Sequence, residues 1–200
     1  QQMTSAAGKA EQIFRILNRE VWVVTSSDSE RRGGLLATWV SQASLDPERP
    51  VILAGLAPNH HTTALVRSSG RLAVHLLDSD QSDVAWNFCR DSGRERDKLE
   101  DFELENRFPY TPVLKQCHSY LIGQVFACVE TGERTYFWAD VVHAGKHSSR
   151  TPLCEQQFID WCDEPRKALL KLDKSEDVEL QRELEADFRR RIPDWLRFEE

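Results

Sequence analysis

A strand-like segment in the first quarter of the chain carries more polar side chains than a buried strand normally does. The run GGLLATWVSQASLDP, residues 33–47, sets three hydroxyls and one amide among aliphatic residues: Thr38, Ser41, Gln42 and Ser44. A buried hydroxyl without a hydrogen-bond partner costs about 1–3 kcal/mol, so these groups must face either water or a polar ligand. One explanation is that side chains alternate between the two faces of the strand, although Ser41 would then lie on the opposite face from the other three. The other explanation is that the strand contacts a flat heteroaromatic ligand, whose carbonyl and N–H groups would pair with these side chains.

A second polar cluster, PNHHTT at residues 58–63, stands directly before a predicted helix. Backbone N–H groups at the start of a helix, with amide, imidazole and hydroxyl side chains beside them, form a cradle for an anion. The candidates for this cradle are Asn59, His60, His61, Thr62 and Thr63. The alternative is that Asn59 or Thr62 caps the helix and that the two histidines lie on the surface.

Several common catalytic motifs are missing from the sequence. There is no G-x-G-x-x-G fingerprint for a dinucleotide held in the Rossmann manner, and no G-x-S-x-G nucleophile elbow. Gly145, Lys146 and His147 lack the upstream glycine and the following hydroxyl of a P-loop. His143 and His147 have H-x-x-x-H spacing, but Ala144 stands where a catalytic glutamate would be, and the glycine between them disfavours a helix. We therefore predict no metal site.

Composition and charge narrow the class of protein. The 200 residues hold 26 Lys and Arg against 33 Asp and Glu, a net charge of −7, which argues against a general nucleic-acid binder but not against a local pocket for one small anion. The longest apolar stretch, Val51 to Ala57, is far too short to cross a bilayer, and the first twenty residues show no signal-peptide core. Five scattered cysteines without a C-x-x-C pair favour free thiols, so we expect a cytoplasmic protein without membrane partners.

The elements that would position these residues follow from hydrophobic periodicity and from turn residues. Strands are predicted at about 21–25, 35–45, 51–56, 72–77, 117–130 and 133–143, with a polar turn over 26–34 between the first two. Helices are predicted at about 9–18, 59–69, 80–89 and 176–191. Because the strands lack a regular βαβ alternation, the fold is predicted to be mainly β (α+β), a small barrel with inserted helices.

The C-terminal quarter has a different character, and we divide the chain into a body at residues 1–150 and a helical extension at residues 151–200. Prolines separate short helical patterns in this extension. The last pattern places Leu180, Leu184 and Phe188 at i, i+4 and i+8, and its other face is nearly all charged. We expect this helix to dock on the body or on a partner subunit.

Taken in order along the chain, these motifs resemble the flavin reductase-like family, the FMN-binding split barrel. The first strand and turn match the family pattern at Gly34, Ala37, Thr38, Trp39, Ser41, Ser44, Leu45, Asp46 and Pro47. Later matches are His61-Thr62, Gly70 with Leu72, Val74 and His75, Asp97-Lys98-Leu99, Pro112-Val113-Leu114, Tyr120-Leu121 and the corner Gly132-Glu133-Arg134-Thr135. The resemblance covers about residues 15–150, and a series of ordered motifs is far more specific than any one of them.

The resemblance implies a homodimer with FMN in a cleft between the subunits. The strand around Ala37, Thr38 and Ser41 would meet the isoalloxazine, and residues 59–63 would hold the ribityl phosphate. The whole cofactor-binding set would be Leu36, Ala37, Thr38, Ser41, Gln42, Ser44, Asn59, His60, His61, Thr62, Thr63 and Lys98. Members of the family commonly take a hydride from NADH or NADPH and pass electrons to free flavin, a partner oxygenase or another acceptor. Because FMN carries the chemistry, no side chain need act as a nucleophile or base.

Two positions depart from the family pattern. Leu36 replaces a threonine, which removes one hydroxyl near the ring. Arg134 replaces a histidine that often lies near the nicotinamide or substrate; an arginine can pair a pyrophosphate but cannot act as an acid–base group. The predicted function is an NAD(P)H:flavin oxidoreductase that binds FMN. The alternatives are an FMN-binding electron carrier or sensor without NAD(P)H turnover, and a split barrel that has lost flavin and only mediates contacts.

Overall fold

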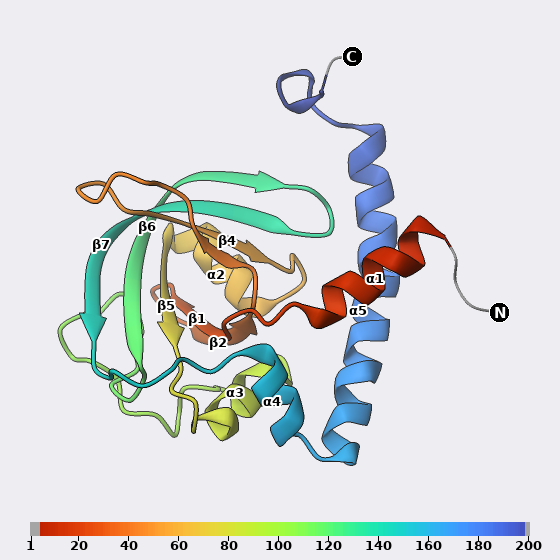
Figure 1. Cartoon of the computed structure of the whole chain (residues 1–200). Helices are drawn as coiled ribbons and strands as arrows, with labels where there is room; N and C mark the ends of the chain where they lie inside the picture. Colours follow the sequence, from red (N-terminus) through yellow and green to blue (C-terminus); the bar gives the residue numbers. More distant parts are fainter. Residues whose placement is uncertain (1–4, 199–200) are drawn as a thin grey trace.

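Residues 5–198 are described by a computed structural model, in which one curved antiparallel sheet forms the body of the protein (Figure 1). The sheet runs in the order β2-β1-β5-β6-β7-β4-β3, and each neighbouring pair is antiparallel. Its strands are β1 (Trp22–Ser27), β2 (Arg32–Ala37), β3 (Val40–Gln42), β4 (Val51–Leu56), β5 (Arg71–Leu76), β6 (Ser119–Glu130) and β7 (Thr135–Lys146). The prediction of a mainly β, barrel-like fold is confirmed.

The helices lie against this sheet and beside it. Helix α2 (His61–Ser69) packs on β1 and β2, and α3 (Ser82–Cys89) packs on β2 and on α4 (Glu155–Trp161). Figure 1 shows α5 (Glu164–Arg190) as a long blue helix along one side of the barrel, near α1 (Ala6–Ile16); a short 3₁₀ turn, Asp194–Leu196, follows α5. No helix between residues 5 and 198 combines the length and the apolar character needed to cross a membrane.

Two hydrophobic clusters fill the two sides of the sheet, as the alternation of side chains along a strand requires. On β5, Leu72 and Val74 belong to one cluster with Phe137, whereas Ala73 belongs to the other with Phe88. All five side chains are fully or almost fully buried. The sheet is therefore held from both sides, which makes it a rigid support for the loops at its edges.

The predicted strand 35–45 is wrong, because the chain breaks at Thr38 and Trp39 into β2 and β3. Strand β2 pairs with β1 and β3 pairs with β4, so the two halves lie at opposite edges of the sheet. The residues between them must cross from one edge to the other, and a straight strand cannot do this. The predicted turn 26–34 is also shorter than expected, since β1 continues to Ser27 and β2 begins at Arg32.

The last helix is longer than the predicted 176–191. It begins at Glu164, where the Asp163 carboxylate caps it by accepting a hydrogen bond of 2.9 Å from Arg166 N, and Pro165 lies in its first turn. Pro165 therefore lies in the first turn of α5, just after the break that separates α5 from α4. Leu180 and Leu184 keep 47% and 40% of their surface exposed, so the apolar stripe of this helix is not the side that packs on the body.

Candidate functional site

The start of α2 presents free polar groups at the edge of the barrel. His60 is the N-cap residue, with extended backbone, and its side chain makes no capping hydrogen bond to the helix. The Thr63 hydroxyl donates a 2.7 Å hydrogen bond to Ala57 O, so it fixes the loop before the helix. Asn59 Oδ1 is buried and has no hydrogen-bond partner among residues 5–198. The loop before α2 thus holds a buried acceptor without a partner, and the first turn of the helix offers backbone N–H groups to a ligand.

A cleft of about 420 Å³ opens beside this helix start. Predicted site residues that line it are Leu36, Asn59, His60, His61, Thr62 and Lys98. They come from β2, from the start of α2 and from the loop after α3. Helix α5 adds three acidic side chains to the same cleft: Asp173, Glu176 and Asp177. The structure therefore brings together half of the residues that the sequence assigned to the cofactor.

Lys98 is the buried cation of the cleft. Its side chain is only 5% exposed, and Nζ donates a 3.1 Å hydrogen bond to Phe88 O. Because burial penalises its charged form, the pKa of Lys98 is lowered to about 8. At neutral pH the ammonium remains charged and has donors to spare for a ligand.

The loop that follows α3 closes the cleft from the other side. Gly93 packs so closely on α2 that a Cβ there would come within 2.9 Å of His61 Cδ2. This approach lets Arg94 donate a 3.1 Å hydrogen bond from Nη1 to Asn59 O. Burial lowers the pKa of His61, which favours its neutral form. The loop after α3 therefore brings two cations, Arg94 and Lys98, to the cleft beside the first turn of α2.

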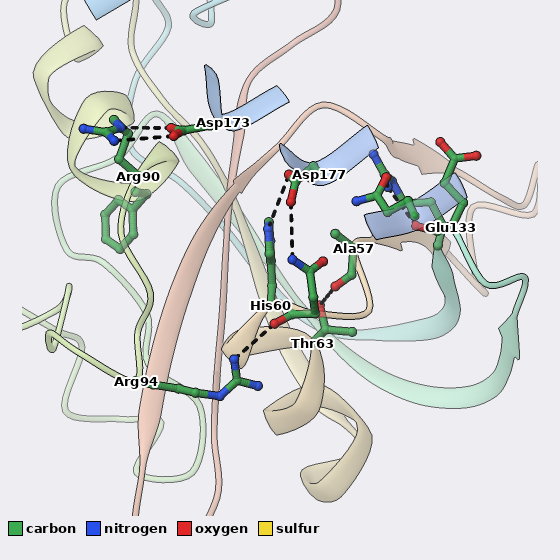
Figure 2. A network of polar contacts seen from close by, with 12 residues as sticks. Ala57, His60, Thr63, Arg90, Arg94, Glu133, Asp173 and Asp177 are labelled. Carbon is green, nitrogen blue, oxygen red and sulfur yellow. Dashed lines mark hydrogen bonds and ion pairs between the residues drawn. The ribbon is translucent and has the colours of Figure 1, made fainter. Parts of the chain in front are cut away.

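Helix α5 contacts the same groups with carboxylates, as Figure 2 shows. Asp173 forms a two-pronged pair with Arg90, with oxygen–nitrogen distances of 2.9 and 3.4 Å. Asp177 accepts a 3.3 Å hydrogen bond from Asn59 Nδ2 and lies 4.0 Å from His60 Nε2. The acidic residues of α5 thus face the candidate anion cradle directly.

Two other predicted residues lie in a separate hollow. Thr38 and Ser41 line a depression of about 510 Å³ together with Trp39, Gly55 and Tyr136. The Ser41 hydroxyl is exposed and donates only to Gln42 O, at 3.0 Å. In the sequence, Ala37 lies between Leu36, which lines the cleft, and Thr38, which lines this hollow.

The polar groups of Gln42 and Ser44 are used within the β3–β4 connection. Ser44 Oγ donates to Arg49 O and accepts from Val51 N, both at 2.9 Å, while Gln42 Nε2 donates to Ser44 O at 2.7 Å. These bonds close the turn after Pro47. Their assignment to the cofactor stays a prediction, although each side chain already has a structural role.

Arg134 lies at the turn between β6 and β7 and is covered by α5. Its guanidinium stands 4.4 Å from the centre of the Trp39 ring, and Nη1 donates 2.8 Å hydrogen bonds to Gln181 Oε1 and to Glu133 O. Burial lowers the pKa of Arg134 from its ordinary value. The predicted position at the nicotinamide side is untested, but the structure shows that this arginine joins the Trp39 hollow to α5.

The sequence did not identify Asp173 and Asp177 of α5, nor Arg90 at the end of α3, as residues of this cleft. The two aspartates are four residues apart and so lie on one face of the helix. That spacing was visible, but the surface that it faces is more than eighty residues away in the sequence. Only the tertiary fold identifies the partners.

Comparison with known proteins defines the class. The sequence model for the family described as "Flavin reductase like domain" matches residues 14–157. The match covers well over half of the chain, so this protein belongs to the flavin reductase-like family. The resemblance found in the sequence motifs is confirmed.

Individual relatives are distant. An uncharacterised protein of Aeropyrum pernix is 44% identical over 63 residues, which is 32% of this chain and 23% of that protein. The diflavin flavoprotein A 1 of a Synechocystis species is 20% identical over 143 residues, 71% of this chain and 25% of that protein. The chain thus spans about a quarter of the length of these two curated relatives.

Solved structures share the fold. The NADH:FAD oxidoreductase of Streptomyces globisporus superposes with a TM-score of 0.65 at 20% identity, covering 74% of this chain and 87% of that one. An FMN-binding protein of Thermus thermophilus gives a TM-score of 0.60 at 22% identity, covering 66% and 73%. At these identities the likeness establishes the split-barrel fold of flavin reductases.

Proposed function

We propose that this chain is an FMN-binding oxidoreductase of the flavin reductase type, which takes a hydride from NADH or NADPH. The observation that carries the proposal is Lys98. Phe88 O is its one hydrogen-bond acceptor among residues 5–198, although an ammonium has three donors and this one is almost fully buried. A buried charge with unused donors is costly unless a ligand completes its surroundings. The anionic groups of a flavin mononucleotide would do so.

The residues of the cleft suit the two ends of such a ligand. The first turn of α2, with Asn59 and Thr62, and the ammonium of Lys98 would hold the phosphate end. Leu36 would pack on the ring end, and Thr38 and Ser41 would contact it if the ligand reached the neighbouring hollow. Bound flavin would supply the hydride acceptor. The protein would orient it, exclude water and offer N–H groups where negative charge develops.

Local charge is the reason for expecting an anion here. The chain as a whole carries a net charge of −7, so its overall field repels a phosphate. Binding must therefore depend on helix N–H groups and on nearby cations, chiefly Lys98 and Arg94, which lie at the cleft. This requirement agrees with the burial of Lys98.

A second candidate function is an FMN-binding electron carrier or sensor without NAD(P)H turnover of its own. It is favoured by Arg134, the residue assigned to the nicotinamide side. The guanidinium of Arg134 is already engaged by the Trp39 ring and by Gln181, so it is not displayed to a second ligand. Hydride donors would then have no obvious cation to hold their pyrophosphate.

We further propose that the protein acts as a homodimer. Large apolar side chains remain exposed around the Trp39 hollow and on β6, with Trp39 41% and Phe126 58% exposed. Exposed aromatic surface of this kind is typical of a subunit interface. Light scattering at micromolar concentration should give twice the mass of the 23.1 kDa chain, and a monomer mass would contradict the proposal.

The function is tested with purified protein, by flavin titration and then by turnover. Fluorescence quenching should show that FMN binds more tightly than riboflavin, because riboflavin lacks the phosphate. Steady-state oxidation of NADH and NADPH with FMN present should proceed well above the rate with free FMN alone. Bound flavin without turnover would favour the electron carrier, and no binding of any flavin would refute both candidates.

A further inference from the structure

Three polar side chains on one face of α5 contact the barrel. Asp173, Asp177 and Gln181 follow one another at four-residue intervals, and they meet Arg90, the Asn59–His60 pair and Arg134 respectively. One turn further on, the helix backbone at Leu184 packs on Gly132. This glycine has φ +79°, and a Cβ on it would collide with the Leu184 carbonyl. The helix is thus aligned along the side of the barrel by four successive contacts, of which the first two lie at the cleft.

Beyond its first turns, where Leu170 packs against the core cluster that contains Phe88, α5 gains little from apolar packing on the barrel. Gln181 is the one buried residue of the helix, whereas Leu172, Val178 and Leu180 are 54%, 41% and 47% exposed. The contacts that remain are ion pairs and hydrogen bonds in partial contact with water, which are individually weak and are screened by salt. The part of the helix from Asp173 onward can therefore leave the barrel without exposing a hydrophobic core.

The two carboxylates of α5 occupy positions that suit the oxygens of a phosphate. Asp177 receives the Asn59 amide N–H and faces His60, while Asp173 receives the Arg90 guanidinium in a two-pronged arrangement. Guanidinium and amide donors bind carboxylate and phosphate oxygens with the same geometry. Figure 2 shows both aspartates pointing from α5 toward these groups.

From this arrangement we infer that α5 is a regulatory strap, whose Asp173 and Asp177 compete with the flavin phosphate for the donors of the cleft. The inference rests on the proposed function, because it concerns the regulation of the same site. A phosphate near −2 cannot share this space with two carboxylates, so binding of FMN requires the strap to move away. Riboflavin has the same ring and no phosphate, so the charge competition acts on FMN alone.

The test compares the dissociation constants of FMN and riboflavin for the whole chain, with and without the two carboxylates of α5. In the variant Asp173→Asn/Asp177→Asn, the dissociation constant of FMN should fall by about fivefold or more, and that of riboflavin should change by less than about twofold. The matched control is Glu179→Gln/Glu183→Gln, which removes the same charge from exposed positions of the same helix and should leave both constants unchanged. Fluorescence quenching measures all four.

A second pair of measurements reports on the helix itself. Gly132→Ala should undock α5 by steric conflict with its backbone and should also tighten FMN binding. Hydrogen exchange of residues 173–190 in the wild-type protein should accelerate when FMN is added and should not respond to riboflavin. A helix that gains protection with FMN would overturn the strap, since it would then be closing over the ligand.

The failures are distinguishable. If FMN binds equally well or more weakly to Asp173→Asn/Asp177→Asn while riboflavin binds normally, the strap is overturned and the proposed function stands. Equal tightening of FMN and riboflavin would also overturn it, because the helix would then act by bulk and not by charge. If no variant binds either flavin, the proposed function is overturned, and the strap that rests on it falls as well.

Discussion

His75 allows the packing of β5 against its neighbours to be tested by pH alone. The imidazole is completely buried, its Nδ1 lies 2.9 Å from Val23 O, and its Nε2 accepts a 3.1 Å hydrogen bond from Leu114 N. One neutral tautomer, with the proton on Nδ1, satisfies both contacts. A second proton on Nε2 would face the N–H of Leu114, so protonation removes a hydrogen bond and places an uncompensated charge in the core.

The size and direction of the effect follow from linkage. Burial lowers the pKa of His75 to about 4 from an ordinary value of 6.5. The unfolded chain therefore takes up the proton first as the pH falls. The stabilisation from neutral His75 is fully present above pH 6.5 and is lost between pH 6.5 and 4. It corresponds to roughly 3 kcal/mol over the whole window, and to about 2 kcal/mol between pH 7.5 and pH 5.

Urea unfolding of the wild-type protein and of His75→Gln, followed by tryptophan fluorescence, measures this difference. Glutamine keeps a neutral donor and acceptor but does not titrate. At one protein concentration, the wild type should lose about 2 kcal/mol more unfolding free energy than the variant when the pH is lowered from 7.5 to 5. All other titrating groups are common to both proteins and cancel. Equal losses would refute the reasoning.

Three further predictions concern the ligand. Lys98→Met should weaken FMN binding about tenfold or more at pH 7. Because burial lowers the pKa of Lys98 to about 8, the FMN affinity of the wild type should fall between pH 7 and 9, whereas that of the variant should not change. Fluorescence titration measures both affinities. Ser41→Leu should weaken flavin binding with a native circular dichroism spectrum, and unchanged affinity would remove Ser41 from the site. Arg134→Ala should raise KM for NADH or NADPH about tenfold or more without weakening FMN binding; unchanged KM for both nucleotides would leave Arg134 as an anchor of α5 alone.

Local sequence signals were enough to predict the centre of the fold. Prolines before and after residues 51–57 set the limits of β4, and Gly70, with φ +68°, ends α2 in the left-handed conformation that a glycine adopts readily. The candidate anion cradle at residues 59–63 could also be predicted, because its members are consecutive and precede a helix; its role in binding stays a prediction. These features depend on neighbours within a few residues, which the sequence shows directly.

Features that depend on distant pairing were not accessible. Nothing between residues 35 and 45 signals a break, since Thr38 and Trp39 are both common in strands. The break is imposed by β2 and β3 joining opposite edges of the sheet. For α5, amphipathic spacing emphasised Leu180 and Leu184, whereas the contacts that dock it are polar. Its partner Asn59 lies 118 residues from Asp177 in the sequence.

Arg134 connects the separate parts of the site. Its guanidinium packs on Trp39 in one hollow and bonds Gln181 on α5, one turn beyond the aspartate that faces the cleft. If α5 leaves when a phosphate enters the cleft, Arg134 loses its hydrogen bond to Gln181 Oε1, and the N–H groups of its guanidinium beside Trp39 become free. The arginine would then be free to bind a second anion only after the flavin is in place. Both candidate functions include FMN binding and so would release α5. They differ in whether the freed Arg134 then holds the pyrophosphate of NADH or NADPH.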